Sequence, residues 1–441
     1  MNKKQNFYIE KAHFAKFKQA ALRYFSTWQP LCALDSNGDE QYKQSSFEWA
    51  LAAGAISEIC IENAENQQNR DIFAEWETWT AAQKNWQFGY LSYDLKNSLE
   101  RLSSDNLDEL QMPLLHFFVP QVLIFLYKNG EVEIQTEAEE PSFIFQQIQN
   151  FSYKIQNFNP KNQIFELKSR FSPNEYLQTV EKIRQHIIEG DVYELNFCQE
   201  FYLNAAEIEP LELYNKLNQL AQTPFAAYFE TKKHAICCAS PERYLRKEAN
   251  YLYSQPIKGT RKRAQTVEND ELIKNELLNS EKDRAENVMI VDLVRNDLSR
   301  VSQAGSVEVQ ELCALYGFSS VWQLISTIKS ELSPNKNWLD AIKYTFPMGS
   351  MTGAPKIAAM ELAELYEKSR RGVYSGAVGY VNPDQNFDFN VLIRSFLYNK
   401  NKQFLSWQVG GAIVFDSQPA EELEECWVKM RPLLRVLGLS E

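Results

Sequence analysis

The order in which strand-like and helix-like segments follow one another most constrains how this chain can fold. The segment QVLIFLYKNGEVEIQT, residues 121–136, consists of an apolar run, an Asn-Gly turn and an alternating run, which predicts an antiparallel hairpin. A helix follows, with a capping box at Ser172 and a stop at Gly190, and residues 234–260 then read as strands around a turn. Mixed strands and helices in this order favour an α+β fold over a regular βαβ array.

The C-terminal half continues the mixture. We predict a strand pair bent at its glycines within residues 403–417, and helices at 281–298, 355–372 and 419–437. Between residues 137 and 165 the composition shifts to Asn and Gln with few glycines. This shift predicts a boundary between an N-terminal region, 1–164, and a C-terminal region, 165–437.

The composition argues against several classes of protein. A chain of 441 residues with 44% hydrophobic residues can bury a sizeable core, and a formal net charge of −12 disfavours binding to nucleic acid or anionic membranes. There is no apolar run of membrane-spanning length and no apolar signal core, so we expect a cytoplasmic protein. The seven cysteines form no C-x-x-C pair, which predicts reduced thiols and no zinc site. No histidine follows His234, so chemistry in the C-terminal half must use carboxylates, lysines or tyrosines.

Two acidic helical segments offer pairs of carboxylates. Asp283 and Glu286 share one helix face, Glu422 and Glu425 share another, and Lys429 lies one turn beyond Glu425. Two such pairs can hold a hard cation such as Mg²⁺, which prefers oxygen ligands. The alternative is two solvated faces, because pairs of this kind are common in a chain with 58 acidic residues.

The glycine-rich segment FPMGSMTGAPK, residues 346–356, does not match a phosphate-binding loop. Ala354 and Pro355 separate Gly353 from Lys356, and no hydroxyl residue follows. The segment still offers backbone amides and hydroxyl groups at a helix N-terminus, where anions bind. The alternative is a turn that only starts the helix.

Cations, a phenol and exposed amides occur further along the chain. Tyr374 and Arg394 lie in strand-like surroundings, and a Gly-Gly pair interrupts a strand pattern. Buried structural pairs are the ordinary alternative for both side chains. Lys258 lies at a strand end, between a proline-led extended segment and a Gly-Thr turn, where the alternative is a charged surface loop.

Six segments, in this order, resemble the chorismate-using enzymes: SPERYL, QPIKGTR, DRAENVMIVDLVRNDLSRV, FPMGSMTGAPKIAAMEL, RRGVYSGAVGYV and GGAIVFDSQPAEELEE. That family includes component I of anthranilate synthase, component I of aminodeoxychorismate synthase, isochorismate synthase and salicylate synthase. The resemblance covers residues 165–437, with weaker similarity in CALDSNG and FGYLSYDL. It implies one large α+β unit, a mixed, mostly antiparallel sandwich of two sheets flanked by helices.

The resemblance implies catalytic roles for Lys258 and Glu242. Aminodeoxychorismate synthases have lysine within the PIxGT motif, where the other branches usually have alanine. Lys258 would attack C2 of chorismate, Glu242 would protonate the leaving C4 hydroxyl, and ammonia would then add at C4. We expect metal and arginine charge to lower the pKa of Lys258, and burial to raise that of Glu242.

The resemblance also implies a Mg²⁺ cofactor. Glu286 and Glu425 match its direct ligands, with Asp283 and Glu422 as an outer pair. The positions that would bind the chorismate dianion are Thr260, Ser350, Tyr374, Arg394, Gly410, Gly411 and Lys429.

The implied reaction makes 4-amino-4-deoxychorismate for p-aminobenzoate and folate synthesis. A separate glutaminase subunit would supply ammonia, because no cysteine here lies in a turn like that of glutaminase nucleophiles. Glu194 stands where isochorismate and salicylate synthases have a water-activating lysine, which disfavours both. The sequence departs from the family at Gln323, often histidine, and at Ala412, usually glycine. The alternatives are anthranilate synthase component I and a noncatalytic protein that binds chorismate or tryptophan.

Overall fold

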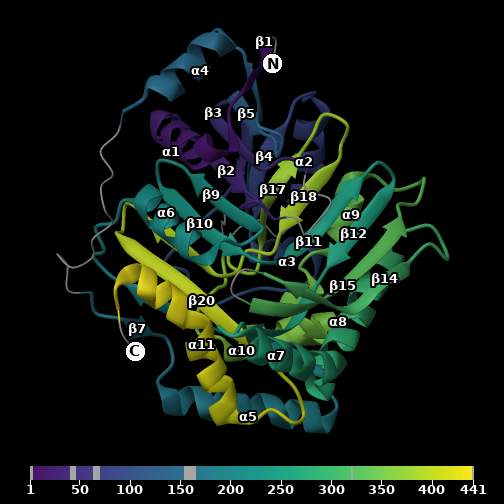
Figure 1. Cartoon of the computed structure of the whole chain (residues 1–441). Helices are drawn as coiled ribbons and strands as arrows, with labels where there is room; N and C mark the ends of the chain where they lie inside the picture. Colours follow the sequence, from purple (N-terminus) through teal and green to yellow (C-terminus); the bar gives the residue numbers. More distant parts are fainter. Residues whose placement is uncertain (1–2, 40–45, 63–69, 153–164, 319–320, 440–441) are drawn as a thin grey trace.

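A computed structural model describes residues 3–39, 46–62, 70–152, 165–318 and 321–439. Figure 1 shows strands at the centre of the molecule with helices around them. In this part of the chain the strands are β1 Lys3–Tyr8, β2 Leu31–Asp35, β3 Trp49–Ile61, β4 Gln87–Leu91, β5 Leu115–Leu126, β6 Glu131–Thr136, β7 Lys168–Ser169, β8 Glu194–Leu203, β9 Phe225–Glu230, β10 His234–Ser240, β11 Arg243–Glu248, β12 Tyr251–Gln255, β13 Ile257–Lys262, β14 Glu308–Gly317, β15 Val321–Glu331, β16 Gly353–Ala354, β17 Ala377–Val381, β18 Phe387–Asn390, β19 Ser395–Asn399 and β20 Phe404–Ile413.

The helices vary in length from one turn to about five. They are α1 Phe14–Tyr24, α2 Ile72–Ala81, α3 Lys96–Leu99, α4 Pro141–Asn150, α5 Pro173–Glu189, α6 Pro210–Ala221, α7 Val267–Asn279, α8 Glu281–Ser299, α9 Trp338–Thr345, α10 Lys356–Tyr366 and α11 Pro419–Leu437, with short 3₁₀ turns at Lys11–His13, Tyr93–Leu95 and Gly349–Met351.

The strands form two arms that separate at β5. One arm continues from β5 through β3, β2, β9, β10, β19 and β20 to β8. The other continues through β4, β17, β18, β11 and β12 to β15, which pairs with β13 and β14. These pairings are antiparallel, and they join the two expected sheets into one hydrogen-bonded network. The expected α+β architecture with flanking helices is confirmed.

Strand alternation places the core on both faces of the first arm. Leu51 and Ala53 of β3 pack with α1, α4, α5, α6, α10 and α11 in one apolar cluster. Their neighbours Ala50 and Ala52 face a second cluster, which contains side chains of both arms together with α2, α8 and α9. Successive residues of a strand point to opposite faces, so the same strands serve both clusters. The second cluster therefore holds the two arms together.

Strands from both regions of the sequence pair with one another. β2 pairs with β9, and β4 pairs with β17, so N-terminal strands lie inside both arms. The boundary predicted at residue 164 falls in 153–164, outside the described residues, and the division of the chain there stays a prediction.

Elements with strong local signals form as predicted. β5 and β6 make the hairpin, with Gly130 at a φ of +92° in its turn. Helix α5 has the capping box between Ser172 and Glu175 and ends at Gly190, whose φ is +87°. Helices α8 and α11 span the predicted acidic segments within one residue.

Two of the predicted elements are wrong. Helix α10 ends at Tyr366 instead of Gly372, because Glu367 leaves the helix to accept hydrogen bonds from the buried Arg371 and from the backbone of Cys198. The predicted bent strand pair is one strand, β20, since its Gly-Gly pair stays in register with β8. In both places, contacts with distant parts of the chain determine the element, and the local glycine does not.

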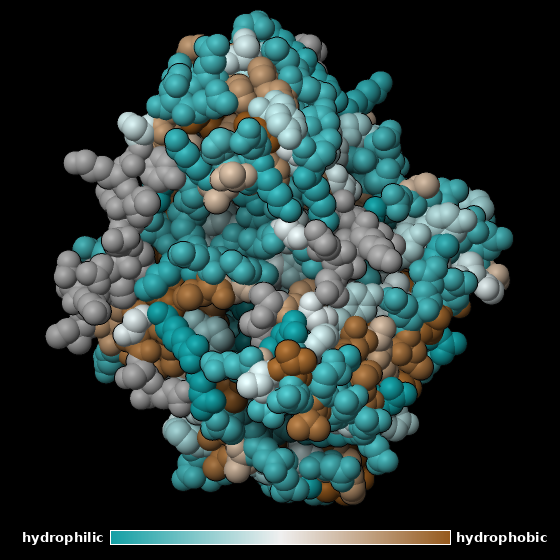
Figure 2. Space-filling model, in the orientation of Figure 1, coloured by the Kyte–Doolittle hydropathy of each residue, from teal (hydrophilic) through white to brown (hydrophobic). Residues whose placement is uncertain are grey.

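The surface is mainly hydrophilic, as the net charge leads one to expect. Figure 2 shows that the hydrophobic areas of this face gather in its lower half, where Figure 1 places α5, α7, α8, α10 and α11. Large exposed hydrophobic side chains on these helices include Leu272, Val288, Ile357 and Val428. Within the described residues, no helix combines the length and apolar character that a membrane crossing needs. All seven cysteines are free thiols.

Candidate active site

An ion pair between Lys258 and Glu194 joins the far ends of the two arms. Lys258 is the second residue of β13, and Glu194 is the first residue of β8. Lys258 Nζ donates a hydrogen bond to Glu194 Oε1 at 2.7 Å, and the two side chains are 11% and 1% exposed. Lys258 is therefore a largely buried amine, which excludes the charged surface loop.

A bulge in β13 directs Lys258 into this site. The register of β13 against β15 shifts between Ile257 and Thr260, and Gly259 has a φ of +83°, a conformation that other residues rarely adopt. A Cβ on Gly259 would also lie 3.0 Å from the Cβ of Asp283 on α8. The glycine of the PIKGT segment thus permits both the bulge and the close approach of α8.

Glu242 lies beside Lys258, in the connection between β10 and β11. Its side chain is buried, and it lines a cavity together with Ser350 and Thr345. Burial raises the pKa of Glu242 to about 7, although a hydrogen bond with Ser350 and the charge of Lys258 both oppose the rise. A carboxyl group of this pKa retains a proton near neutral pH and can transfer it to a leaving group.

More carboxylate groups lie near Lys258 than the sequence led us to expect. Burial by itself would lower the pKa of Lys258, but the carboxylates of Glu194, Glu286 and Glu242 outweigh burial and raise it. The lowered pKa expected from metal and arginine charge stays a prediction for the metal-bound site.

Carboxylates of α8 and α11 lie close enough for their charges to interact. A Cβ on Gly411 would lie 3.2 Å from Glu422 Oε2 and 3.7 Å from Glu425 Oε1, so this glycine leaves room beneath both carboxylates. Burial raises the pKa of Glu422. A hydrogen bond with Ser417 opposes this rise, and the negative charge of Glu425 adds to it. Burial also raises the pKa of Glu286. The positive charge of Lys258 opposes this rise, and the negative charges of Glu194 and Glu425 add to it.

This donor set fits a hard divalent cation. Glu422 Oε2 is buried and has no hydrogen-bond partner among the described residues, and the like charges around Glu286 and Glu422 would be relieved by a cation. Mg²⁺ usually keeps several waters and bridges a few carboxylates to a substrate, so an open arrangement suits it. Asp283 is turned toward Arg261, at 2.8 Å, and its place in the outer pair stays a prediction.

Three of the predicted anion-binding residues, Lys429, Gly410 and Arg394, are connected by hydrogen bonds. Lys429 Nζ donates to the carbonyl oxygen of Gly410 at 2.6 Å and pairs with Glu425 at 2.5 Å. Arg394 donates to the backbone oxygen of Lys429 at 2.9 Å. Tyr374 is buried near Arg394, whose charge counteracts the burial that raises the pKa of the Tyr374 hydroxyl. Two cations and a phenol thus adjoin the carboxylates of α11.

Thr260 lies apart from this group, at the exposed end of the bulge. Gln323 donates a hydrogen bond to the Thr260 hydroxyl at 3.4 Å, so the residue that replaces the common histidine contacts a predicted substrate-binding position. Ala412 pairs with Asn196 in the ladder between β20 and β8.

The segment FPMGSMTGAPK is built around a buried ion pair. Lys356 pairs with Asp297 of α8 at 2.5 Å and donates to the carbonyl oxygens of Thr345 and Pro347. A lysine held in this way is not available to a phosphate group, which agrees with the mismatch to a phosphate-binding loop. The segment instead presents Ser350 toward Glu242.

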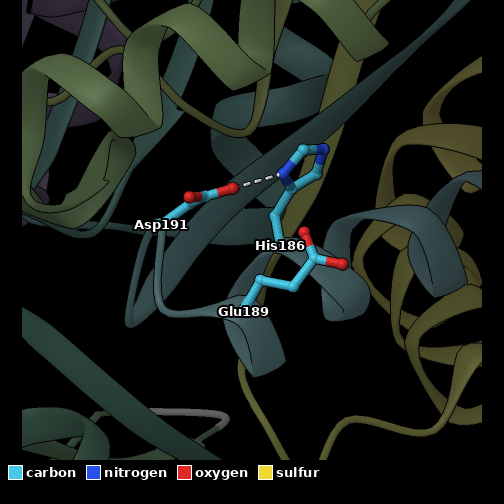
Figure 3. A group of neighbouring side chains, drawn as sticks. All are labelled: His186, Glu189 and Asp191. Carbon is cyan, nitrogen blue, oxygen red and sulfur yellow. Dashed lines mark hydrogen bonds and ion pairs between the residues drawn. The ribbon is translucent and has the colours of Figure 1, made fainter.

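A cluster outside this site also has the composition of a metal site. The ligand atoms of His186, Glu189 and Asp191, at the end of α5, lie within 4.8 Å of one another, and Figure 3 shows these side chains converging. Both ring nitrogens of His186 are engaged, since Nδ1 bonds Asp191 at 2.7 Å and Nε2 bonds the Tyr366 hydroxyl at 2.8 Å. We interpret the cluster as a structural tie between α5 and α10.

The segment ALDSN lies in the other half of the molecule. Asp35 and Ser36 line a second cavity with Phe47, Tyr380 and Asn390. Lys18 pairs with Asp35 at 2.8 Å, so a basic side chain already neutralises this acid.

Sequence reasoning missed the contact between Glu194 and Lys258. It used this residue only as a reason against a water-activating lysine, although strand β8 brings Glu194 to the nucleophile candidate. The available signal was a glutamate at the start of a strand that continues with buried residues. Helix α7, which packs against β13, was also missed.

Comparison with known proteins places the chain among enzymes of chorismate. A family model described as chorismate binding enzyme matches residues 11–435. Aminodeoxychorismate synthase component 1 of Bacillus subtilis (strain 168) is 33% identical over 365 residues, which cover 80% of this chain and 77% of that protein. Anthranilate synthase component 1 of Acetivibrio thermocellus is 32% identical over 369 residues, covering 79% and 74%.

The fold is that of a solved relative. The crystal structure of anthranilate synthase component I from Streptococcus pneumoniae TIGR4 superposes with a TM-score of 0.75 at 25% identity, over 90% of this chain and 95% of that one. The aminodeoxychorismate and anthranilate synthases resemble this chain to almost the same degree. Similarity therefore selects the family without selecting the product.

Proposed function

The chain belongs to the family of chorismate-binding enzymes, and on this premise we propose that it is the synthase component that converts chorismate and ammonia to 4-amino-4-deoxychorismate. The buried amine of Lys258 carries the proposal. It lies at the PIKGT position where the other branches usually have alanine, and a carboxyl group that holds a proton near neutral pH lies beside it.

The reaction would proceed in two displacements. The neutral amine of Lys258 forms a bond to C2 of chorismate, the two conjugated ring double bonds shift to C1=C6 and C4=C5, and the C4–O bond breaks as Glu242 donates its proton, which releases water. Ammonia then forms a bond to C4, both double bonds shift back, and the bond between C2 and Lys258 breaks. The new ammonium group returns a proton to Glu242, so the enzyme is regenerated.

The carboxylates of chorismate would bind at the two charged groups of the site. Glu286 and Glu425 would hold Mg²⁺, which neutralises negative charge on the ring carboxylate when bound. Lys429, Arg394 and Tyr374 would bind the second carboxylate with charge-assisted and neutral hydrogen bonds. This arrangement explains how a chain with a net charge of −12 binds a dianion.

Ammonia would come from a separate glutaminase subunit. Six of the seven cysteines are buried, and burial raises the pKa of thiols such as Cys198, to about 12, so they are poor nucleophiles. The name of the Bacillus relative, component 1, implies a second component. Exposed apolar side chains on α7, α8 and α10, the helices around the site, are a suitable surface for a partner.

The test is to incubate the purified protein with chorismate, Mg²⁺ and an ammonium salt and to identify the products by chromatography with mass detection. We expect aminodeoxychorismate and no pyruvate. Pyruvate with anthranilate would refute the proposal and assign the chain to the other branch. Unchanged chorismate, with binding detected by calorimetry, would instead support a noncatalytic binding protein.

Anthranilate synthase component I is the second candidate function. The similarity to the Acetivibrio enzyme, 32% over 369 residues, favours it. Lys258 argues against it, and Gln323 is compatible with a reaction that stops at aminodeoxychorismate, because pyruvate elimination in the anthranilate branch is associated with the histidine that Gln323 replaces.

A further inference from the structure

Lys258 has one hydrogen-bond acceptor among the described residues, and it is a carboxylate. Glu194 Oε1 lies 2.7 Å from Lys258 Nζ, and the pair is almost entirely shielded from water. An ammonium group cannot attack a carbon atom, so the nucleophile proposed above must first lose a proton. Little water reaches this pair, so the acceptor must be part of the site.

The second oxygen of Glu194 is free for a bound molecule. Glu194 Oε2 is buried and has no hydrogen-bond partner in the described part of the chain. A buried carboxylate oxygen without a partner is costly unless a ligand or water completes it. A proton or an N–H group of a bound molecule would satisfy this oxygen.

The other carboxylates near Lys258 are committed to different tasks. Four acidic side chains influence the charge of Lys258 or respond to it: Glu194 from β8, Glu242 from the β10–β11 connection, Glu286 from α8 and Glu425 from α11. Glu242 must keep its proton for the leaving hydroxyl, and Glu286 and Glu425 would hold Mg²⁺. Glu194 alone of the four contacts the amine and has no other task.

The backbone holds Glu194 in a fixed position. Ala354 of β16 pairs with Glu194, and a Cβ on Gly353 would lie 2.1 Å from the carbonyl oxygen of Glu194. The next residue, Leu195, pairs with Ile413 of β20. A carboxylate anchored on two sides can keep the short contact with Lys258 through the reaction.

We propose that Glu194 is the proton acceptor for Lys258. It takes the proton that Lys258 must lose before attacking chorismate, and it returns that proton when Lys258 is displaced. The proposal rests on the function proposed above.

The proton and electron balance closes without another reactant. The ammonium of Lys258 and the carboxylate of Glu194 become a neutral amine and a carboxylic acid. The amine attacks C2 and becomes a secondary ammonium, and the C4 hydroxyl leaves as water with the proton of Glu242. When ammonia adds at C4, Lys258 departs as a neutral amine and recovers its proton from Glu194.

The test compares Glu194→Gln and Glu194→Asp with Glu200→Gln as a matched control. Glu200 is a buried carboxylate on the same strand, but it pairs with Arg170 and Ser406, away from Lys258. With ammonium, Mg²⁺ and chorismate at about pH 7.5, we expect E194Q to lower kcat by about 100-fold or more, because a general base contributes on that order. E194D should recover part of this loss, and E200Q should retain kcat if it is folded.

A second measurement separates a proton acceptor from a merely structural partner. The rate at which acetic anhydride acetylates Lys258 is followed by peptide mass spectrometry, which reports the fraction of free amine without any turnover. Loss of the Glu194 charge should favour the neutral amine, so acetylation of Lys258 should become several-fold faster in E194Q while kcat falls. Faster acetylation with unchanged or higher kcat would refute the proposal, and slower acetylation with lower kcat would show a structural role.

Failure of this proposal differs from failure of the proposed function. If the wild-type protein forms aminodeoxychorismate and E194Q matches it, only the role of Glu194 is refuted. If the wild-type protein consumes chorismate and forms no aminodeoxychorismate, the proposed function fails, and this proposal fails with it. Chromatography with mass detection of the wild-type products distinguishes the two failures.

Discussion

The pH dependence of catalysis tests whether Glu242 is the acid that protonates the leaving hydroxyl. Glu242 is 5% exposed, and burial raises its pKa from 4.5 to about 7. At pH 7 a group of that pKa is about half protonated, whereas an ordinary glutamic acid is about 0.3% protonated. Burial therefore increases the acid-competent fraction by about 150-fold, equivalent to about 3 kcal/mol.

The rate should follow this fraction. Because the raised pKa keeps the proton on Glu242 below neutrality and releases it above, kcat/KM for chorismate should be level up to about pH 6.5 and fall about tenfold per pH unit above about pH 7.5. The assay is product formation at low chorismate concentration in a series of buffers of constant ionic strength. Glu242→Gln should remove the fall and lower kcat/KM by about 10²- to 10⁴-fold.

Ser350 provides a graded perturbation of the same group. Its hydrogen bond opposes the rise in the pKa of Glu242, so Ser350→Ala should move the fall to higher pH by about half a unit to one unit, the value of one hydrogen bond. Ser299→Ala, on the exposed side of α8, is the control and should leave the profile in place. A fall that persists in E242Q, or that does not move in S350A, would assign the titration to another group.

Three further predictions concern the nucleophile, the cation and the framework. Lys258→Ala should bind chorismate with little change in calorimetry but form no covalent adduct and no aminodeoxychorismate; unchanged turnover would remove its role as nucleophile. Glu286→Gln should raise the Mg²⁺ concentration needed for half-maximal activity by about tenfold or more, because it removes a charged oxygen ligand. An unaltered Mg²⁺ titration would show that this face of α8 is solvated and binds no metal. Lys356→Met should lower the free energy of unfolding in urea by about 3 kcal/mol, because it leaves the buried Asp297 without its partner. A change in this free energy within experimental error would mean that the ion pair does not stabilise the fold.

Local signals in the sequence predicted the hairpin and four of the helices, α5, α8, α10 and α11. The capping box at Ser172 and the glycine at Gly190 satisfy free backbone groups within a few residues, so their effect does not depend on the rest of the fold. Helix α10 shows the limit of such signals. Its end depends on Arg371, a buried cation that bonds Glu367 and the backbone oxygen of Asn196, and local periodicity contains no information on that partner.

In the candidate site, too, some features follow from the sequence and others only from the tertiary structure. The sequence by itself determined which residue types are present and their spacing on each helix, so Lys258, Glu242 and the carboxylate pairs were identified as candidates by motif. Only the tertiary structure decided that Lys258 meets Glu194, 64 residues away, because the two residues lie at the far ends of different sheet arms. The charge around Lys258 then follows from those contacts, since electrostatic effects depend on distance and burial and not on separation along the chain.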